Sequence, residues 1–179
     1  GGYFPLNKYK FASKYIIISV VINLLSVVLH ESGHAFIYFL QGYKVDFHFT
    51  HADPISGVNT LLGASGGLLF NILFGLLLLK LFSIYKNIYL FSGVIANTWF
   101  SRLFLYIIKL PSGTFPNDET VIAKYLNTPT FIICLLIFII LSLILYFAIK
   151  ELYKIFNKEK AKKLLSYSLI ASIISLMIV

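Results

Sequence analysis

The run from Tyr15 to Leu40 is apolar along most of its length, yet it carries two histidines and a glutamate near its C-terminal end. As a helix rising 1.5 Å per residue it would be about 39 Å long, enough to cross the hydrocarbon core of a bilayer. Each ionisable side chain inside such a span costs on the order of 3 kcal/mol. Three of them within five residues therefore need a compensating partner, and a divalent cation would serve.

The polar insertion reads His30-Glu31-Ser32-Gly33-His34. Histidines four residues apart project from one face of a helix, so both imidazoles can bind a single zinc ion. Glu31 lies beside them, where a carboxylate can act as the general base for a water activated by that ion. The pattern is typical of zinc hydrolases, here placed inside a membrane helix.

Composition indicates an integral membrane protein, because 59% of the residues are hydrophobic and only 12% are charged. The mean hydropathy is +0.87. The net charge of +8 does not indicate nucleic acid, since the lysines lie mostly at the ends of apolar runs, where anionic headgroups and topology explain them better. The single cysteine, Cys134, excludes an internal disulfide and a cysteine zinc cluster.

We predict an all-α integral membrane protein with about four to five transmembrane helices in a single transmembrane domain, residues 1–179. A polar lead precedes the first span and ends at Lys14. The spans are expected at about 15–40, 61–82, 88–108, 131–149 and 164–179. The last is an apolar tail just short of the usual spanning length.

The segment from Tyr43 to His51 alternates with a period of two and is rich in aromatic and β-branched residues. This pattern indicates a β-strand or hairpin arm against the helix bundle near the metal site, or equally a polar loop. The following residues, Asp53-Pro54-Ile55-Ser56-Gly57, are expected to turn the chain back.

Small or polar residues recur at intervals of four in the second span, at Gly63, Gly67, Asn71 and Gly75. Such a stripe lets another helix approach closely, and we expect Asn71 to serve that packing rather than the catalytic site. In the third span Asn97 and Ser101 share a face that either points at the site or bonds a neighbouring backbone. Arg102 either extends to the membrane interface or pairs with an acid.

Catalytic zinc usually takes three protein ligands, so the two histidines need a third. One soluble class supplies it with a glycine at position 37 and a histidine at position 40, which Ile37 and Leu40 exclude. The acids and histidines on the same side of the membrane are Asp46, His48, His51, Asp53, Asp118 and Glu119. Asp118 is our choice, because its proline-broken loop can re-enter the protein. Its other reading, compatible with the first, is an N-cap for a helix starting at Glu119.

Lysines are distributed unequally between the two ends of the expected spans. The lead, the connector around Lys80 and Lys86, and the connector 150–163 hold eleven lysines, against Lys44, Lys109 and Lys124 at the opposite end. Because cationic short loops stay inside, the N-terminus is expected in the cytoplasm and the loops 41–60 and 110–128 outside. The active site would then lie toward the extracytoplasmic side.

With these features the chain resembles the site-2 protease family of intramembrane zinc metalloproteases, in particular its smaller bacterial branches. The resemblance covers roughly residues 15–130 and rests on His30-Glu31-x-x-His34-Ala35, on the glycine-rich second span ending in Asn71, and on Asp118 in a proline-rich loop. Family members usually show an Asp-Gly pair after an Asn-x-x-Pro element; here Glu119 follows Asp118, and Ile108 stands three residues before Pro111. The family also tends to hold its zinc nearer the cytoplasm than the lysines suggest here.

The resemblance implies a zinc metalloendopeptidase of the bacterial plasma membrane. His30, His34 and Asp118 would hold one zinc ion per chain, and Glu31 would be the catalytic residue. The substrate would be a membrane protein or membrane peptide, cut in or near a transmembrane segment within the lipid bilayer, in regulated intramembrane proteolysis or peptide processing. The Tyr43–His51 strand would hold the unwound substrate by edge pairing.

Two other classes of function remain open. The first is a non-proteolytic zinc-binding membrane scaffold or a metal transporter; the sequence disfavours transport because polar residues are not spread over several spans as an ion pathway requires. The second is a cleavage-dead member of the family that only binds membrane helices. Glu31 disfavours it, since a pure binding site has no need for a base beside the metal.

Overall fold

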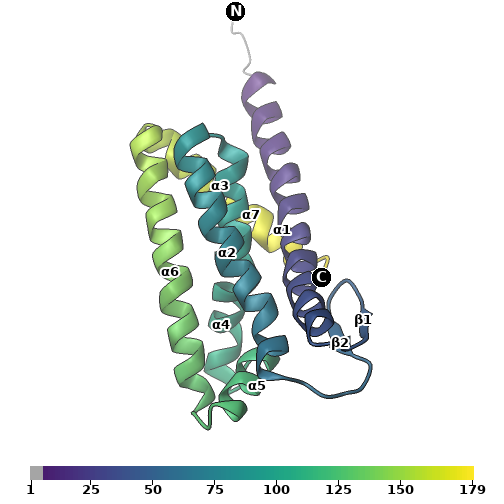
Figure 1. Cartoon of the computed structure of the whole chain (residues 1–179). Helices are drawn as coiled ribbons and strands as arrows, with labels where there is room; N and C mark the ends of the chain where they lie inside the picture. The colour runs from purple at the N-terminus through teal and green to yellow at the C-terminus, as the bar shows by residue number, and fades with distance from the viewer. Residues whose placement is uncertain (1–5) are drawn as a thin grey trace, which may run out of the picture.

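A bundle of long helices makes up most of the computed structural model, which describes residues 6–179 (Figure 1). Within these residues four helices are long and apolar enough to cross a membrane: α1 (Leu6–Leu40), α2 (Leu61–Tyr85), the continuous helix Ile88–Lys109 and α6 (Thr130–Ile155). Their outward faces expose leucine, isoleucine and phenylalanine side chains, as a lipid-facing surface requires. The predicted fold class is confirmed, with four of the expected spans.

The helices are longer than the apolar runs alone predict. α1 begins at Leu6, so the latter part of the predicted polar lead is helical, while residues 1–5 of that lead lie outside the described residues. α6 continues to Ile155, through the start of the expected cationic connector. A lysine near the end of a membrane helix can lay its aliphatic stem along apolar surface and keep its ammonium group in water. The helix can therefore continue past the apolar run into residues that include lysine.

The fifth predicted span, 164–179, corresponds to α7 (Lys158–Leu176), which starts earlier and has lysines in its first turns. It is not among the helices long and apolar enough to cross a membrane within residues 6–179. α7 lies beside α1, where the Tyr15 hydroxyl and Ser168 Oγ are 3.0 Å apart and Asn23 Nδ2 donates to Ser175 Oγ at 3.1 Å. Buried polar contacts therefore fix α7 along the first half of α1.

A two-stranded antiparallel hairpin follows α1, with β1 (Val45–Phe47) paired to β2 (Ala52–Pro54). The hairpin confirms a β element in this region, but its turn falls at residues 48–51, closed by the His48 N–H donating to the His51 carbonyl at 2.8 Å. The expected turn at 53–57 is thus only partly right, because Asp53 and Pro54 belong to β2. A second turn follows, in which the Gly57 N–H donates to the Pro54 carbonyl at 2.8 Å.

The third span is interrupted by a π-helix. α3 (Ile88–Ile95) leads into η1 (Ala96–Leu103) and then α4 (Phe104–Lys109), and the Phe104 N–H donates to the Trp99 carbonyl five residues back. Such wide turns are frequent at functional sites, and this one contains Arg102. Of the two alternatives for Asn97, the structure shows the bond to a neighbouring backbone group, since its Nδ2 donates to the Gly93 carbonyl at 2.9 Å.

After η2 (Leu110–Ser112), the short helix α5 (Asn117–Tyr125) packs against α2 and α6 at the same end of the bundle as the hairpin (Figure 1). The predicted loop at 110–128 and its short helix are therefore present. The lysine-rich ends of α1, α2, α6 and α7 gather at the opposite end (Figure 1).

α1 and α2 touch backbone to backbone through glycines. A Cβ on Gly33 would lie 2.5 Å from the Gly66 carbonyl oxygen, and a Cβ on Gly66 would lie 2.4 Å from the Gly33 carbonyl oxygen. Neither position accepts a side chain without moving a helix. The second span does use small residues for close helix contact, and the contacted helix is α1, but the backbone contact falls at Gly66 rather than at a residue of the predicted stripe.

Replacing Gly66 with alanine should therefore destabilise the protein by about 1–3 kcal/mol, because the new methyl group overpacks a backbone contact. The matched control is Gly75→Ala, where the added Cβ would meet its nearest atom, Thr98 Cγ2, at an ordinary 3.6 Å. The thermal unfolding midpoint in detergent measures both. Equal midpoints for the two variants would contradict the close contact.

Candidate metal centre

The site begins on α1, whose last turns carry His30, Glu31 and His34 inside the protein. The two imidazoles lie one turn apart with ring centroids 4.8 Å from each other. This spacing agrees with the prediction that a helix presents both histidines on one face. The site is closer to the hairpin end of α1 than to its lysine-rich end (Figure 1).

Asp118 from α5 joins the two histidines. Its Oδ2 lies 3.1 Å from His30 Nε2 and 3.4 Å from His34 Nε2, and the two Nε2 atoms are 3.1 Å apart. Four-coordinate ions with bonds of about 2.0–2.1 Å separate their ligands by about 3.3 Å, so the triangle has the size of one face of a tetrahedral site. The structure thus brings together the three predicted ligand residues as a group that could hold a metal ion.

Asp118 does not cap its helix. Pro116 occupies the N-cap position of α5, and Asp118 lies in the first turn with its side chain directed at the histidines. The N-cap interpretation is therefore wrong, because the helix starts earlier than expected. Burial raises the pKa of the Asp118 carboxyl, but Arg102 and the two histidines lower it, and the resulting pKa is well below the usual value. The group is a carboxylate, as a metal ligand must be.

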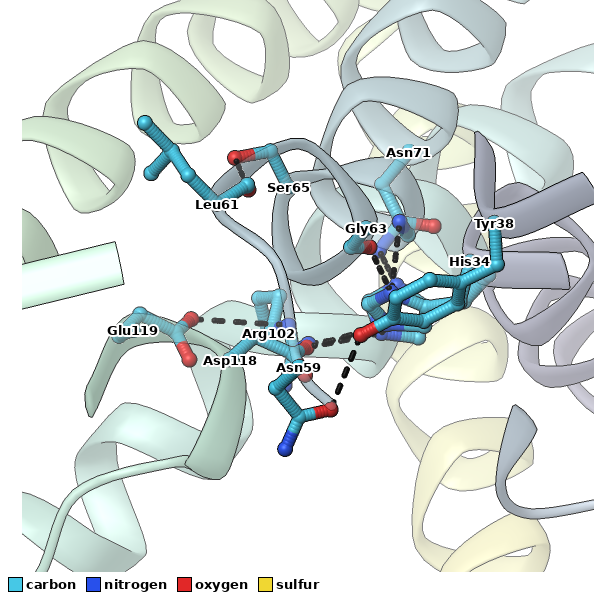
Figure 2. Close-up of polar contacts among 12 residues, drawn as sticks. His34, Tyr38, Asn59, Leu61, Gly63, Ser65, Asn71, Arg102, Asp118 and Glu119 are labelled. Carbon is cyan, nitrogen blue, oxygen red and sulfur yellow. Dashed lines mark hydrogen bonds and ion pairs between the residues drawn. The ribbon is translucent and has the colours of Figure 1, made fainter. Parts of the chain in front are cut away.

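The outer nitrogen of each imidazole contacts α2. His34 Nδ1 donates to the Gly63 carbonyl at 2.7 Å, which leaves the lone pair of its Nε2 directed into the triangle (Figure 2). His30 Nδ1 lies 3.0 Å from the amide nitrogen of Asn71, whose Oδ1 is buried without a hydrogen bond among residues 6–179. A half-turn of that amide gives Oδ1 the Nδ1–H of His30 and places His30 in the same ligand tautomer.

Asn71 is thus part of the site, and the expectation that it serves packing alone is wrong. Gly63, Gly67 and Asn71 of the stripe do face α1, at the height of the histidines, whereas Gly75 faces Thr98 and Ile144. A Cβ on Gly67 would lie 2.4 Å from His30 Cε1 and 2.5 Å from the Nε2 atoms of both histidines. Glycine at this position leaves room for the imidazoles and for whatever they bind.

Arg102 is the site residue that the sequence analysis did not place. Its Nη2 lies 2.7 Å from His30 Nε2 and donates to Asp118 Oδ2. Its Nε lies 3.7 Å from Glu119 Oε1 (Figure 2). The same oxygen accepts a hydrogen bond from the Tyr106 hydroxyl at 2.5 Å. Pairing with an acid was one of its two predicted roles. The structure shows that one of the paired acids is Asp118, the third ligand candidate.

The formal charges of the site are compatible with a divalent cation. Glu31 and Glu119 are buried and Asp118 is largely so, and the cationic Arg102 contacts Asp118 and Glu119. With neutral histidines and ionised carboxylates, these residues carry a formal charge of two negatives. Because uncompensated buried charge costs several kcal/mol, a doubly charged ion fits the donor set and the charge together.

A cavity of about 330 Å³ opens beside the triangle. Glu31, Tyr38 and Arg102 line it, together with His51 and Asp53 from the hairpin. Of the other candidate ligands, Asp46 and His48 pair with each other at 3.1 Å on the exposed side of the hairpin. Within residues 6–179 the metal-ligand group contains His30, His34 and Asp118, without a hairpin residue.

Comparison with known proteins found no match: no family model, curated protein or solved structure matches the chain. The description of the site therefore rests on its geometry. The structure has four membrane-length helices, a His/His/Asp group contacted by α1, α2, η1 and α5, and a carboxylate from the same helix as the histidines that lines the adjoining cavity.

Replacing Asp118 with asparagine should remove tightly bound metal, because the amide keeps the size of the side chain but loses the anionic ligand. Asp53→Asn is the matched control, since Asp53 lines the same cavity outside the ligand triangle. Elemental analysis of protein purified in detergent measures the metal content. Full occupancy in the Asp118→Asn variant would show that Asp118 is not a ligand.

Proposed function

We propose that the protein is an intramembrane zinc metalloprotease of the site-2 protease type, which hydrolyses a peptide bond in or near a transmembrane segment of another membrane protein. The observation that carries the proposal is the convergence of His30, His34 and Asp118 from two separate segments, next to a cavity lined by Glu31. Metal binding alone would explain the three ligand-type residues. It would not explain the carboxylate beside them.

Zinc is the ion that the donor set favours. Two imidazole nitrogens and one carboxylate oxygen are a common ligand set for catalytic zinc, and three protein ligands leave a coordination position open for the reaction. When bound, the ion would supply Lewis-acid activation of water and of the peptide carbonyl. The outer contacts of His30 and His34 with α2 would hold both rings in place for it.

Glu31 is the proposed catalytic base. Its carboxylate lines the cavity, and among residues 6–179 it is held by no hydrogen bond, which leaves both oxygens free to accept a proton. Glu31 would take a proton from the attacking water and deliver it to the leaving amine. Burial in an apolar span makes a carboxylate without such a task costly to keep.

The substrate must present an extended segment, because a helix engages its carbonyls in its own hydrogen bonds. The hairpin offers a place for such a segment. Lys44 pairs with Ile55 and His48 with His51 through ladder hydrogen bonds, so the intervening pairs alternate. The N–H groups of Val45 and Phe47 therefore point away from β2, as a free strand edge available for pairing.

The proposed location is a bacterial plasma membrane with the N-terminal end of α1 in the cytoplasm. The lysine-rich helix ends lie together at one end of the bundle, and short cationic segments stay on the cytoplasmic side (Figure 1). The hairpin, α5 and the cavity would then face the extracytoplasmic side.

A metal transporter is the second candidate, because buried polar side chains line α1 between Tyr15 and His30. These are Ser19, Asn23 and Ser26, and they were not recognised as a polar line in the sequence. Each bonds a neighbouring group, as in Ser92 Oγ donating to Ser19 Oγ at 2.8 Å. They therefore have a packing role already, which leaves the protease as the better-supported proposal.

Glu31→Gln should abolish proteolysis while zinc content stays unchanged, because the amide cannot accept a proton. The assay is co-reconstitution with synthetic single-span peptides that carry helix-breaking Asn-Pro pairs at different depths, with products identified by mass spectrometry. Glu151→Gln, near the lysine-rich end of α6, is the matched control and should cleave normally. A transporter would instead cleave no peptide and keep its zinc flux after the Glu31 change.

Proline at position 45 or 47 should reduce cleavage strongly without loss of zinc. Proline removes an outward N–H from the free edge but leaves the ladder bonds of Lys44 and His48 in place. The controls Val45→Ala and Phe47→Ala shorten the side chain and keep the N–H. Cleavage rates of the same peptides, measured together with zinc content, test whether the substrate pairs with the edge of β1. Unchanged rates in the proline variants would exclude edge pairing.

A further inference from the structure

Arg102 contacts the very atoms that a metal ion would use. Its Nη2 lies 2.7 Å from His30 Nε2 and donates to Asp118 Oδ2, and both of these atoms belong to the ligand triangle. A guanidinium nitrogen and a metal ion cannot occupy this space together, because each needs the same lone pairs at close range. Metal binding therefore requires the guanidinium group to move.

The structure also contains the place to which it can move. Arg102 Nε and Glu119 Oε2 are both buried without a hydrogen-bond partner among residues 6–179. Nε lies 3.7 Å from Glu119 Oε1, just beyond hydrogen-bond distance. A small shift of the guanidinium toward Glu119 would satisfy both unpartnered groups and withdraw Nη2 from the triangle.

Glu119 is held ready for this contact. It is fully buried, and the Tyr106 hydroxyl donates to its Oε1 at 2.5 Å, which fixes the carboxylate on the side of Arg102 away from the histidines (Figure 2). Asp118 and Glu119 are neighbours on the first turn of α5. The Arg102 guanidinium group can therefore move from one carboxylate to the other without a change of the backbone.

We propose that Arg102 is an internal competitor of the metal ion: it positions Asp118 in the metal-free protein and shifts to Glu119 when the ion binds. This inference rests on the metal binding of the proposed function but not on peptide hydrolysis. Arg102 keeps the ligand triangle formed without metal, since its positive charge offsets part of the negative charge of two neighbouring carboxylates. The same contact lowers metal affinity, because the ion must displace it and then remain near a like charge.

The primary test is zinc affinity, measured by competition with a chelating fluorescent indicator in detergent. Arg102→Gln removes the charge and should bind zinc about tenfold or more tightly than the wild type. A purely structural role for Arg102 predicts the reverse, because a misplaced Asp118 would weaken binding. An affinity equal to or lower than that of the wild type would overturn the proposal.

Thermal unfolding provides a second test that distinguishes competition with the metal ion from a purely structural role of Arg102. Without zinc, Arg102→Gln should unfold at a lower temperature than the wild type, since two carboxylates lose their cation. With saturating zinc this difference should shrink, because the ion replaces the missing charge and the variant binds it more tightly. A difference of the same size with and without zinc would contradict the competition.

Glu119→Gln provides a variant that keeps Arg102 and tests its destination. Zinc affinity should fall, and the fall should be larger when Arg102 is present than in the Arg102→Gln background, since only the arginine uses Glu119 as its alternative partner. Equal losses in both backgrounds would exclude the shift. If the wild type itself bound no zinc, the proposed function would fail; if it bound zinc but the Arg102 variants failed these tests, only this inference would.

Discussion

Uncompensated charge in an apolar interior is the constraint on which this structure depends. Glu31, Asp118, Glu119 and Arg102 sit among helices whose outer faces are apolar, and each needs a partner that the bilayer cannot provide. The fold answers by bringing α5 back against the bundle, so that the two acids of its first turn meet the arginine of η1. The histidines of α1 complete the cluster. A divalent ion would remove the negative charge that remains, which is why the same constraint supports both the fold and the proposed chemistry.

Backbone geometry positions several of the site residues. η1 widens the third span by a π-helical turn, and its arginine reaches across to α1 and α5. α2 contributes mainly backbone and small residues: the Gly63 carbonyl orients His34, and the missing side chain at Gly67 leaves space for both imidazoles. Precise placement of ligands therefore comes from helices rather than from flexible loops. The hairpin and α5, which also line the cavity, are short elements.

Much of this could be predicted from the sequence, for identifiable reasons. Apolar run length predicts the four membrane-length helices, although it also suggested a fifth span at 164–179, and the spacing of His30 and His34 predicts their shared face. Asp118 could be selected because few acids lie in the two loops that are expected at the His34 end of the spans. Other features depend on three-dimensional detail that no local pattern carries. The contacts of Arg102 depend on a π-helical turn, and the contact of Asn71 with His30 depends on where α1 and α2 pack against each other. The ends of α1, α6 and α7 depend on how far each helix continues into the lysine-containing residues beyond its apolar run.

The glycine contact between α1 and α2 divides the molecule mechanically. Because the Gly33 and Gly66 backbones touch, neither helix can rotate or slide past the other without a steric collision. These two helices are therefore fixed relative to each other, and α1 carries both imidazoles. Asp118 comes from a third element, α5. Any displacement of α5 relative to α1 would therefore change the distances between the Asp118 carboxylate and the two imidazoles.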